Sequence, residues 1–130
     1  MYYLEKEFNV ACSHKLHDIS LTTEENKTIF GRCNNLHGHT FKIVLKLKSE
    51  KLNNANGMIV NFYDIKKIFN HVIDYRFDHK HLNDDELFKD IVPTSENMCY
   101  IFYNLLKPFI SELYAIQVHE SDTSCAEYVD

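Results

Sequence analysis

Apolar and polar residues alternate along two long stretches of the chain, which is the pattern of half-buried β-strands. The first stretch runs from Tyr2 to His14 and the second from His37 to Lys48. On the second stretch, one parity carries two histidines and then only apolar residues, whereas the other is largely basic. Two further strands are predicted, from about Leu113 to Glu120 and, shorter, from Ala126 to Tyr128. We therefore expect one face of each long strand to be buried in a core.

Two later segments show the three-to-four-residue spacing of amphipathic helices. Asn61 is suited to cap the first, whose apolar positions are Phe62, Ile65, Ile68, Phe69, Val72 and Ile73. The second follows Pro93, with Thr94 or Ser95 as its N-cap, and Pro108 is expected to end it. These spacings predict two helices, each with one buried face.

The remaining segments predict the connections and the order of elements. Residues 15–36 and 74–92 are polar and irregular, so we expect loops there. The run Asn53–Gly57 is a turn signal that leads into a short predicted strand, Met58 to Val60. The order strand, strand, strand, helix, helix, strand predicts one α+β domain over residues 1–130, an antiparallel sheet with two helices on one face. Its uncovered sheet edges predict a homo-oligomer.

Composition excludes several classes of partner and site. The net charge of −5 argues against nucleic acid, and no apolar run approaches the roughly 20 residues of a membrane helix. The opening residues lack the basic and apolar segments of a signal peptide, so we expect a cytoplasmic protein. The four cysteines include no Cys-x-x-Cys pair, which argues against a thiolate zinc knot. Three of them, Cys12, Cys99 and Cys125, are expected to be packing residues.

The strand pattern brings three histidines together. His37 and His39 are two residues apart on a strand, so their side chains point the same way. Antiparallel pairing would bring His14, at the end of the first strand, beside the start of the second. Three imidazoles with one open position are typical of a catalytic zinc site. The alternative is a set of hydrogen-bonded core histidines.

Four other residues carry candidate chemistry. Cys33 lies four residues before His37, and a nearby cation would favour its thiolate form and make it a general base; the alternative is a passive packing thiol. Asp78 and His79 are adjacent in a predicted loop, where the carboxylate could orient the imidazole, although His81 is an equal candidate. Glu120 ends an apolar strand on its inward parity and needs a partner, either a ligand N–H or a salt bridge.

Taken together, these motifs resemble the 6-pyruvoyl-tetrahydropterin synthase family from about Glu7 to Tyr128. The matching elements, in chain order, are His14, Cys33-x-x-x-His37-Gly38-His39, Asp78-His79-x-x-Leu82-Asn83, Pro93-Thr94-Ser95-Glu96-Asn97 and Glu120-x-x-Thr123-Ser124. The resemblance implies the tunnelling fold, a four-stranded antiparallel sheet with two helices that assembles into an oligomeric barrel. It also implies trimers or hexamers with active sites between subunits.

The resemblance further implies a role for each site residue. His14, His37 and His39 would bind Zn²⁺, Cys33 would be the base, and Asp78 with His79 would complete a catalytic triad. Glu120 would anchor the pterin ring, and Thr94 would lie in the substrate site. The substrate would be dihydroneopterin triphosphate, for which the sequence leaves the phosphate-binding cations open.

Two features favour one branch of the family. Three residues separate Cys33 from His37, as is usual in the bacterial queuosine-pathway enzymes, whereas animal 6-pyruvoyl synthases usually place five. The tail Thr123–Tyr128 also resembles the bacterial type, although Cys125 stands where a bulkier residue is common. The expected activity is that of a 6-carboxy-5,6,7,8-tetrahydropterin synthase. The alternatives are 6-pyruvoyl-tetrahydropterin synthase and a non-enzymatic zinc-binding module.

Overall fold

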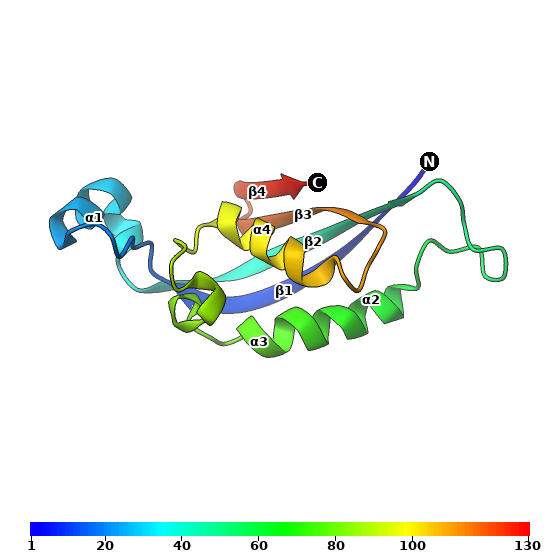
Figure 1. The fold of residues 1–130 in the computed structure, drawn as a ribbon, viewed down its shortest axis with the longest axis horizontal. Helices are drawn as coiled ribbons and strands as arrows, with labels where there is room; N and C mark the ends of the chain where they lie inside the picture. Colours follow the sequence, from blue (N-terminus) through cyan, green and yellow to red (C-terminus); the bar gives the residue numbers. More distant parts are fainter.

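The computed structural model describes residues 1–130 as a four-stranded antiparallel sheet with helices on one face (Figure 1). The strands follow each other across the sheet in chain order: β1 (Tyr2–His14), β2 (His37–Ser49), β3 (Leu113–Ser121) and β4 (Ser124–Val129). The predicted α+β architecture is thus confirmed. Both outer strands, β1 and β4, leave one edge without a sheet partner.

The two long strands pair along their whole length, with Tyr2 opposite Ser49 and His14 opposite His37. Alternation along β2 buries one face, where Phe41, Ile43, Leu45 and Leu47 are fully buried. The opposite face carries basic residues. One of them, Lys46, forms an ion pair with Glu127 of β4, in which Nζ lies 2.7 Å from Oε1. The periodicity of the sequence thus identified the buried face correctly.

Helices α2 (Phe62–Phe69) and α4 (Ser95–Leu106) cover the buried face of the sheet (Figure 1). Helix α4 packs against β3 and β4. Helix α2 packs against β1, where Phe69 stacks on Phe8 with ring centroids 3.9 Å apart. The predicted caps are confirmed, because Asn61 accepts a hydrogen bond from the Tyr63 N–H and Thr94 accepts one from the Asn97 N–H.

Helical structure extends beyond the predicted end of the first helix. After α2 the chain continues through a π-helical turn, Asn70–Asp74, into the short helix α3 (Tyr75–Phe77). The predicted loop 74–92 therefore begins too early, and it also contains two short 3-10 helices, Leu82–Asp84 and Glu86–Phe88. Phe77 is fully buried and packs on Phe102 of α4, which explains why the helix continues.

Two sequence predictions about connections are wrong. The supposed loop 15–36 contains α1 (Thr23–Phe30) and a 3-10 helix, Gly31–Asn34. A capping box formed by Thr22 and Glu25 begins α1, but its only buried residue is Asn26, so it has no apolar stripe to reveal it. The predicted strand Met58 to Val60 is absent, because this segment has no strand partner and instead closes a turn with Asn53. None of the helices has the length and apolar character needed to cross a bilayer.

Candidate functional site

The end of β1 and the start of β2 bring three histidines to one end of the buried face. His14 lies opposite His37, and His39 lies opposite Cys12 in the same ladder. The imidazole centroids of His14 and His37 are 4.5 Å apart, and that of His39 lies 5.3 Å from His14. Gly38, between the two histidines of β2, has no room for a side chain without crowding, since a Cβ atom there would lie 3.3 Å from the Cys12 carbonyl oxygen.

Main-chain carbonyls orient two of the rings through their Nδ1 atoms. His14 Nδ1 donates to the Pro93 carbonyl at 2.8 Å, and His37 Nδ1 donates to the Asn35 carbonyl at 2.7 Å. Each ring is therefore held in the tautomer that leaves Nε2 as an unprotonated donor atom for a metal. Burial lowers the pKa of His14, which favours the neutral form that a metal requires.

The Nε2 atoms of His14 and His39 are buried and have no hydrogen-bond partner. Ordinary core histidines would have such partners, because an unsatisfied buried polar atom is costly. The alternative interpretation as hydrogen-bonded core residues therefore fails for this cluster. Unpartnered imidazole nitrogens that converge are instead what a metal ion would satisfy.

Glu120 joins the histidines from β3. It shares the parity of Ile116 and Val118, which are buried, so its side chain lies on the same face of the sheet as theirs. Its Oε1 atom lies 2.7 Å from His39 Nε2, without a hydrogen bond between them. One ligand atom from each of four residues, His14, His37, His39 and Glu120, lies within 4.8 Å of the others.

This donor set fits a zinc ion. Four atoms bound tetrahedrally at about 2.0–2.1 Å would lie about 3.4 Å apart, a value between the shortest and the longest separation in the cluster. Three imidazole nitrogens and one carboxylate oxygen are ligands that Zn²⁺ prefers. The structure thus brings together the three predicted ligands and adds a fourth group.

Cys33 lies close in the chain to the cluster but makes no side-chain hydrogen bond. It belongs to the 3-10 helix Gly31–Asn34 and is half-buried. Its carbonyl accepts from the Leu16 N–H at 2.8 Å, which ties it to the segment that follows His14. The other thiols differ: Cys12 and Cys99 are buried, and burial raises the pKa of each to about 12, whereas Cys125 is exposed. The expectation that Cys125 is a packing residue is therefore wrong, because β4 is an edge strand.

Asp78 and His79 form a hydrogen-bonded pair beside the outer edge of β1. His79 Nδ1 donates to Asp78 Oδ2 at 2.6 Å, and Asp78 Oδ1 accepts from the Ala11 N–H at 2.9 Å. The hydrogen bond from Ala11, followed by the one from His79, lowers the pKa of the Asp78 carboxyl. His79 has a positive φ of 59°, an unfavourable conformation of the kind found at functional sites. The His79 side chain is 82% exposed.

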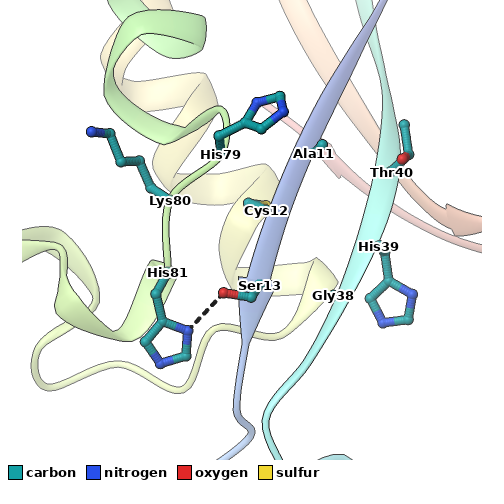
Figure 2. A pocket seen from close by; sticks show the side chains of 9 residues that line it. All are labelled: Ala11, Cys12, Ser13, Gly38, His39, Thr40, His79, Lys80 and His81. Atoms are coloured by element: carbon teal, nitrogen blue, oxygen red, sulfur yellow. Dashed lines mark hydrogen bonds between the residues drawn. The ribbon is translucent and has the colours of Figure 1, made fainter.

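The segment that carries this pair runs along β1 like a short extra strand (Figure 2). The Ser13 N–H donates to the Lys80 carbonyl at 3.0 Å, and Ser13 forms a parallel bridge with His81. The ring of His81, the sequence's other candidate, hydrogen-bonds the Ser13 hydroxyl at 3.0 Å and has no carboxylate partner. The geometry of an oriented acid or base therefore belongs to His79.

An open cavity of about 640 Å³ is lined by this segment and by the neighbouring strands β1 and β2 (Figure 2). The residues that line it are Ala11, Cys12, Ser13, Gly38, His39, Thr40, His79, Lys80 and His81. Cys33 and Glu120 are not among them. This cavity therefore contains His79 but not Cys33.

Sequence reasoning missed several groups that hold the site in place. The side-chain amide of Asn83 accepts from the Lys15 N–H at 2.8 Å and donates to the Lys15 carbonyl at 2.7 Å. This pair fixes the backbone directly after His14. The Pro93 carbonyl, which orients His14, directly precedes Thr94, whose hydroxyl caps α4. Backbone carbonyls cannot be recognised in a pattern of residue types. Asn83, in contrast, belongs to the motif Asp78-His79-x-x-Leu82-Asn83.

Comparison with known proteins agrees with this geometry. Residues 3–130 match the family model described as 6-pyruvoyl tetrahydropterin synthase. The chain is 37% identical to the 6-pyruvoyl tetrahydrobiopterin synthase of Poecilia reticulata, over 97% of this chain and 88% of that protein. It is 29% identical to the 6-carboxy-5,6,7,8-tetrahydropterin synthase of Synechocystis, over 98% of this chain and 93% of that protein.

A solved structure shows the same fold. The 6-pyruvoyl tetrahydropterin synthase of Caenorhabditis elegans superimposes with a TM-score of 0.93 at 31% identity, over 99% of this chain and 95% of that chain. The agreement extends over the sheet, the helices and the segments that carry the candidate site. This chain belongs to the 6-pyruvoyl tetrahydropterin synthase family of enzymes.

Proposed function

We propose that the protein is a zinc-dependent lyase that converts 7,8-dihydroneopterin triphosphate to 6-carboxy-5,6,7,8-tetrahydropterin, acetaldehyde and triphosphate. The observation that carries this proposal is the convergence of three histidines, two of which, His14 and His39, have a buried Nε2 atom without a hydrogen-bond partner. Membership of the family supplies the substrate class. The 6-carboxy product would place the enzyme in queuosine (7-deazaguanine) biosynthesis, in the cytoplasm.

Each candidate residue has a defined task in this proposal. Zn²⁺ held by His14, His37 and His39 would polarise the side-chain hydroxyls of the substrate and acidify neighbouring protons. Cys33 removes a proton from the substrate side chain, and His79 returns or relays one through Nε2. Asp78 keeps the His79 ring in the tautomer with Nδ1 protonated. The second carboxylate, Glu120, accepts hydrogen bonds from the pterin ring, with Thr94 nearby in the substrate site.

We also propose that active sites are completed between subunits of a homo-oligomer, either a trimer or a hexamer. Two observations support this. The cavity that contains His79 does not include Cys33, and the outer edges of β4 and of β1 before Ala11 have no strand partner. Unpaired edges are suited to pairing with a second copy. A neighbouring chain would then bring its Asp78–His79 pair toward the Cys33 and metal cluster of this one.

The product distinguishes two candidate activities. Three residues between Cys33 and His37 favour the 6-carboxy branch. The second candidate is 6-pyruvoyl-tetrahydropterin synthase, which stops after elimination of triphosphate. It is favoured by the higher identity to the fish and human synthases, each 37%, than to the Synechocystis enzyme, at 29%.

The deciding experiment is incubation of the purified, zinc-loaded protein with 7,8-dihydroneopterin triphosphate, followed by mass analysis of pterins and trapped aldehydes. A 6-carboxy pterin together with acetaldehyde is expected. A pyruvoyl pterin without acetaldehyde would move the chain to the second candidate. Absence of turnover by protein with confirmed zinc content would contradict both. The Cys33→Ala protein serves as the control for uncatalysed breakdown.

A further inference from the structure

An ion pair closes the loop that carries Asp78 and His79. Arg76 lies in α3, and Asp85, nine positions further along the chain, lies between the 3-10 helices Leu82–Asp84 and Glu86–Phe88. The guanidinium donates to both carboxylate oxygens, from Nε to Oδ2 at 2.9 Å and from Nη2 to Oδ1 at 2.8 Å. Such a two-point contact fixes the direction of both groups as well as their distance. The two ends of the loop are therefore held in one relative orientation.

The surroundings make this ion pair stronger than one on an open surface. The Asp85 side chain is 15% exposed, and the Arg76 guanidinium also lies over the Phe77 ring, 5.4 Å from its centroid. Burial alone would raise the pKa of Asp85, but hydrogen bonds from Arg76 and from the Leu87 N–H outweigh it and lower this pKa. Because Phe77 is fully buried, the ion pair is also joined to the core.

The backbone of His79 needs such support because its conformation is unfavourable. Its φ of 59° is the only positive φ at a residue other than glycine. A conformation of this kind persists only where the surrounding contacts impose it. The His79 N–H is bonded to the Ala11 carbonyl of β1, which fixes one side of the turn. Between residues 70–77 and 80–88, the Arg76–Asp85 pair is the only link made by side-chain hydrogen bonds.

The turn at His79 is also what brings its ring to Asp78. In an extended chain, the side chains of adjacent residues point to opposite sides. The positive φ at His79 instead turns its side chain back, and Nδ1 donates to Asp78 Oδ2 at 2.6 Å. Loss of this conformation would therefore separate the ring from the carboxylate that fixes its tautomer.

We propose that Arg76 and Asp85 are positioning residues, a clasp that holds His79 in its positive-φ conformation and thereby keeps the imidazole on Asp78. The effect of the clasp on turnover rests on the proposed function, whereas its effect on the His79 ring is a property of the folded chain. Neither Arg76 nor Asp85 lines the cavity that contains His79, which is why we assign them an indirect role.

The first test observes the His79 ring without turnover. The variant is Arg76→Gln, which removes the two-point contact and leaves Asp85 able to cap the 3-10 helix Glu86–Phe88. Nitrogen NMR of full-length protein with labelled histidine rings, at slightly alkaline pH, reports which ring nitrogen carries the proton. The signals of His79 are identified by their absence from His79→Ala. The wild type should show Nδ1 protonated, and Arg76→Gln should shift toward the Nε2-protonated form that predominates in a free imidazole side chain.

Three further variants calibrate this shift. Asp78→Ala supplies the spectrum of a ring without its carboxylate. Asp85→Asn weakens the clasp but keeps an oxygen for the Leu87 N–H, so it should give the same direction of shift if Arg76→Gln does not fold. Glu24→Gln is the matched control, because it removes an exposed ion pair with Lys27 in α1 and should leave the His79 signals unchanged.

Turnover supplies a second readout. Misplacement of the ring should lower kcat by roughly 10- to 100-fold in Arg76→Gln, while KM and zinc content stay close to those of the wild type. In the His79→Ala background, Arg76→Gln should lower kcat no further, because the group through which the clasp acts is already gone. Arg76→Lys keeps the charge without the planar two-point contact, so it should restore only part of kcat.

A wild-type tautomer of His79 in both Arg76→Gln and Asp85→Asn would overturn the inference, whatever their turnover. So would an equal loss of kcat from Arg76→Gln in the wild-type and His79→Ala backgrounds, since that is the behaviour of a general structural defect. Failure of the proposed function looks different. A wild-type protein without turnover, in which the His79 signals still shift as expected, would retain the clasp and remove the lyase assignment.

Discussion

His14 and His79 differ in chemistry because different groups accept the hydrogen bond from Nδ1 of each ring. The Pro93 carbonyl holds Nδ1 of His14, so its Nε2 is left as a buried donor atom for a metal. The carboxylate of Asp78 holds Nδ1 of His79, so its Nε2 is left in solvent to exchange protons. A carbonyl fixes a neutral ring, whereas a carboxylate also stabilises the protonated one. Residue type alone therefore does not determine the role.

Cys33→Ala is expected to lower turnover by about 10²–10⁴-fold, the usual contribution of a general base, while the zinc content stays unchanged. The reason is that Cys33 lies outside the group of four ligand atoms. Turnover rates and metal analysis of the same sample check both parts. The matched control is Cys125→Ala, which removes an exposed thiol and should leave turnover intact. Near-normal turnover of the Cys33→Ala protein would remove Cys33 as the base.

Asp78 should contribute stability that depends on pH. Its folded-state pKa lies below the ordinary 3.8, mainly because the Ala11 N–H donates to the carboxylate. A lowered carboxyl pKa stabilises the fold fully above the ordinary value, and that contribution is lost as pH falls through the folded-state pKa. The free energy of unfolding of the wild type minus that of Asp78→Asn should therefore be constant near neutrality and decrease below about pH 4. Denaturant unfolding of both proteins between pH 3 and pH 7 measures it; a difference that stays constant to pH 3 would contradict the assignment.

At the scale of elements, the site depends on how loops are tied to the ends of strands. The segment after α3 pairs with the outer edge of β1 through the Ser13 N–H and the Lys80 carbonyl, and this places the Asp78–His79 pair. Asn83 then closes on Lys15 with two hydrogen bonds. The end of β1, which carries His14, is thus held by β2 on one side and by this segment on the other.

Asn83→Ala is expected to lower both stability and metal affinity. Two hydrogen bonds to Lys15 are lost, which corresponds to about 1–3 kcal/mol of unfolding free energy. Zn²⁺ affinity should fall about 10-fold, because the backbone beside His14 loses its support. Asn104→Ala is the matched control, since that amide bonds only within α4 on an exposed surface. Reduced stability with unchanged Zn²⁺ affinity would limit Asn83 to a structural role.

At the scale of the whole molecule, the cluster of four candidate metal ligands lies beside the hydrophobic core rather than within it. The core consists of 22 buried residues from the sheet, its covering helices and the segments that follow them, and none of these residues is a histidine. His14 is the one cluster member that is fully buried. The fold therefore has a source of stability that does not depend on the ion.

Removal of the metal by a chelator should leave the protein folded but inactive. The far-UV circular dichroism spectrum should stay unchanged at 25 °C, and the melting temperature should fall because the folded state loses a bound ligand. Activity should return on addition of Zn²⁺. Unfolding at 25 °C on chelation would instead indicate a structural ion, the behaviour of a non-enzymatic zinc module.

Shared active sites predict that two inactive variants rescue each other. Cys33→Ala and His79→Ala chains, each inactive alone, should regain part of the wild-type turnover when they are co-expressed and assemble together. The reason is that some interfaces would combine an intact Cys33 with an intact His79 from its neighbour. Turnover of the isolated mixed oligomer checks this, and mixing without reassembly is the control. No recovery in confirmed mixed oligomers would place each complete site within one chain.

Much of the fold and part of the site could be predicted from the sequence, because these features depend on local periodicity. Alternation from Tyr2 to His14 and from His37 to Lys48 determined two strands, and the shared parity of His37 and His39 determined that their side chains point the same way. Periodicity did not predict α1, because this helix buries only Asn26 and has no apolar stripe. The capping box that begins at Thr22 was the one local feature that could have indicated it. The periodicity of a segment indicates which of its faces is buried, but not which distant residues pack against that face.

The tertiary structure alone decided which groups meet. Glu120 of β3 lies beside His39 of β2 because of the register in which these two strands pair, and this register does not follow from residue order. The carbonyls that orient His14 and His37 are main-chain atoms, which every residue possesses. The separation of Cys33 from the pocket of His79 is likewise a matter of packing between distant segments. Distances across a fold arise from packing and strand register, and a periodic pattern in one strand contains no information about either.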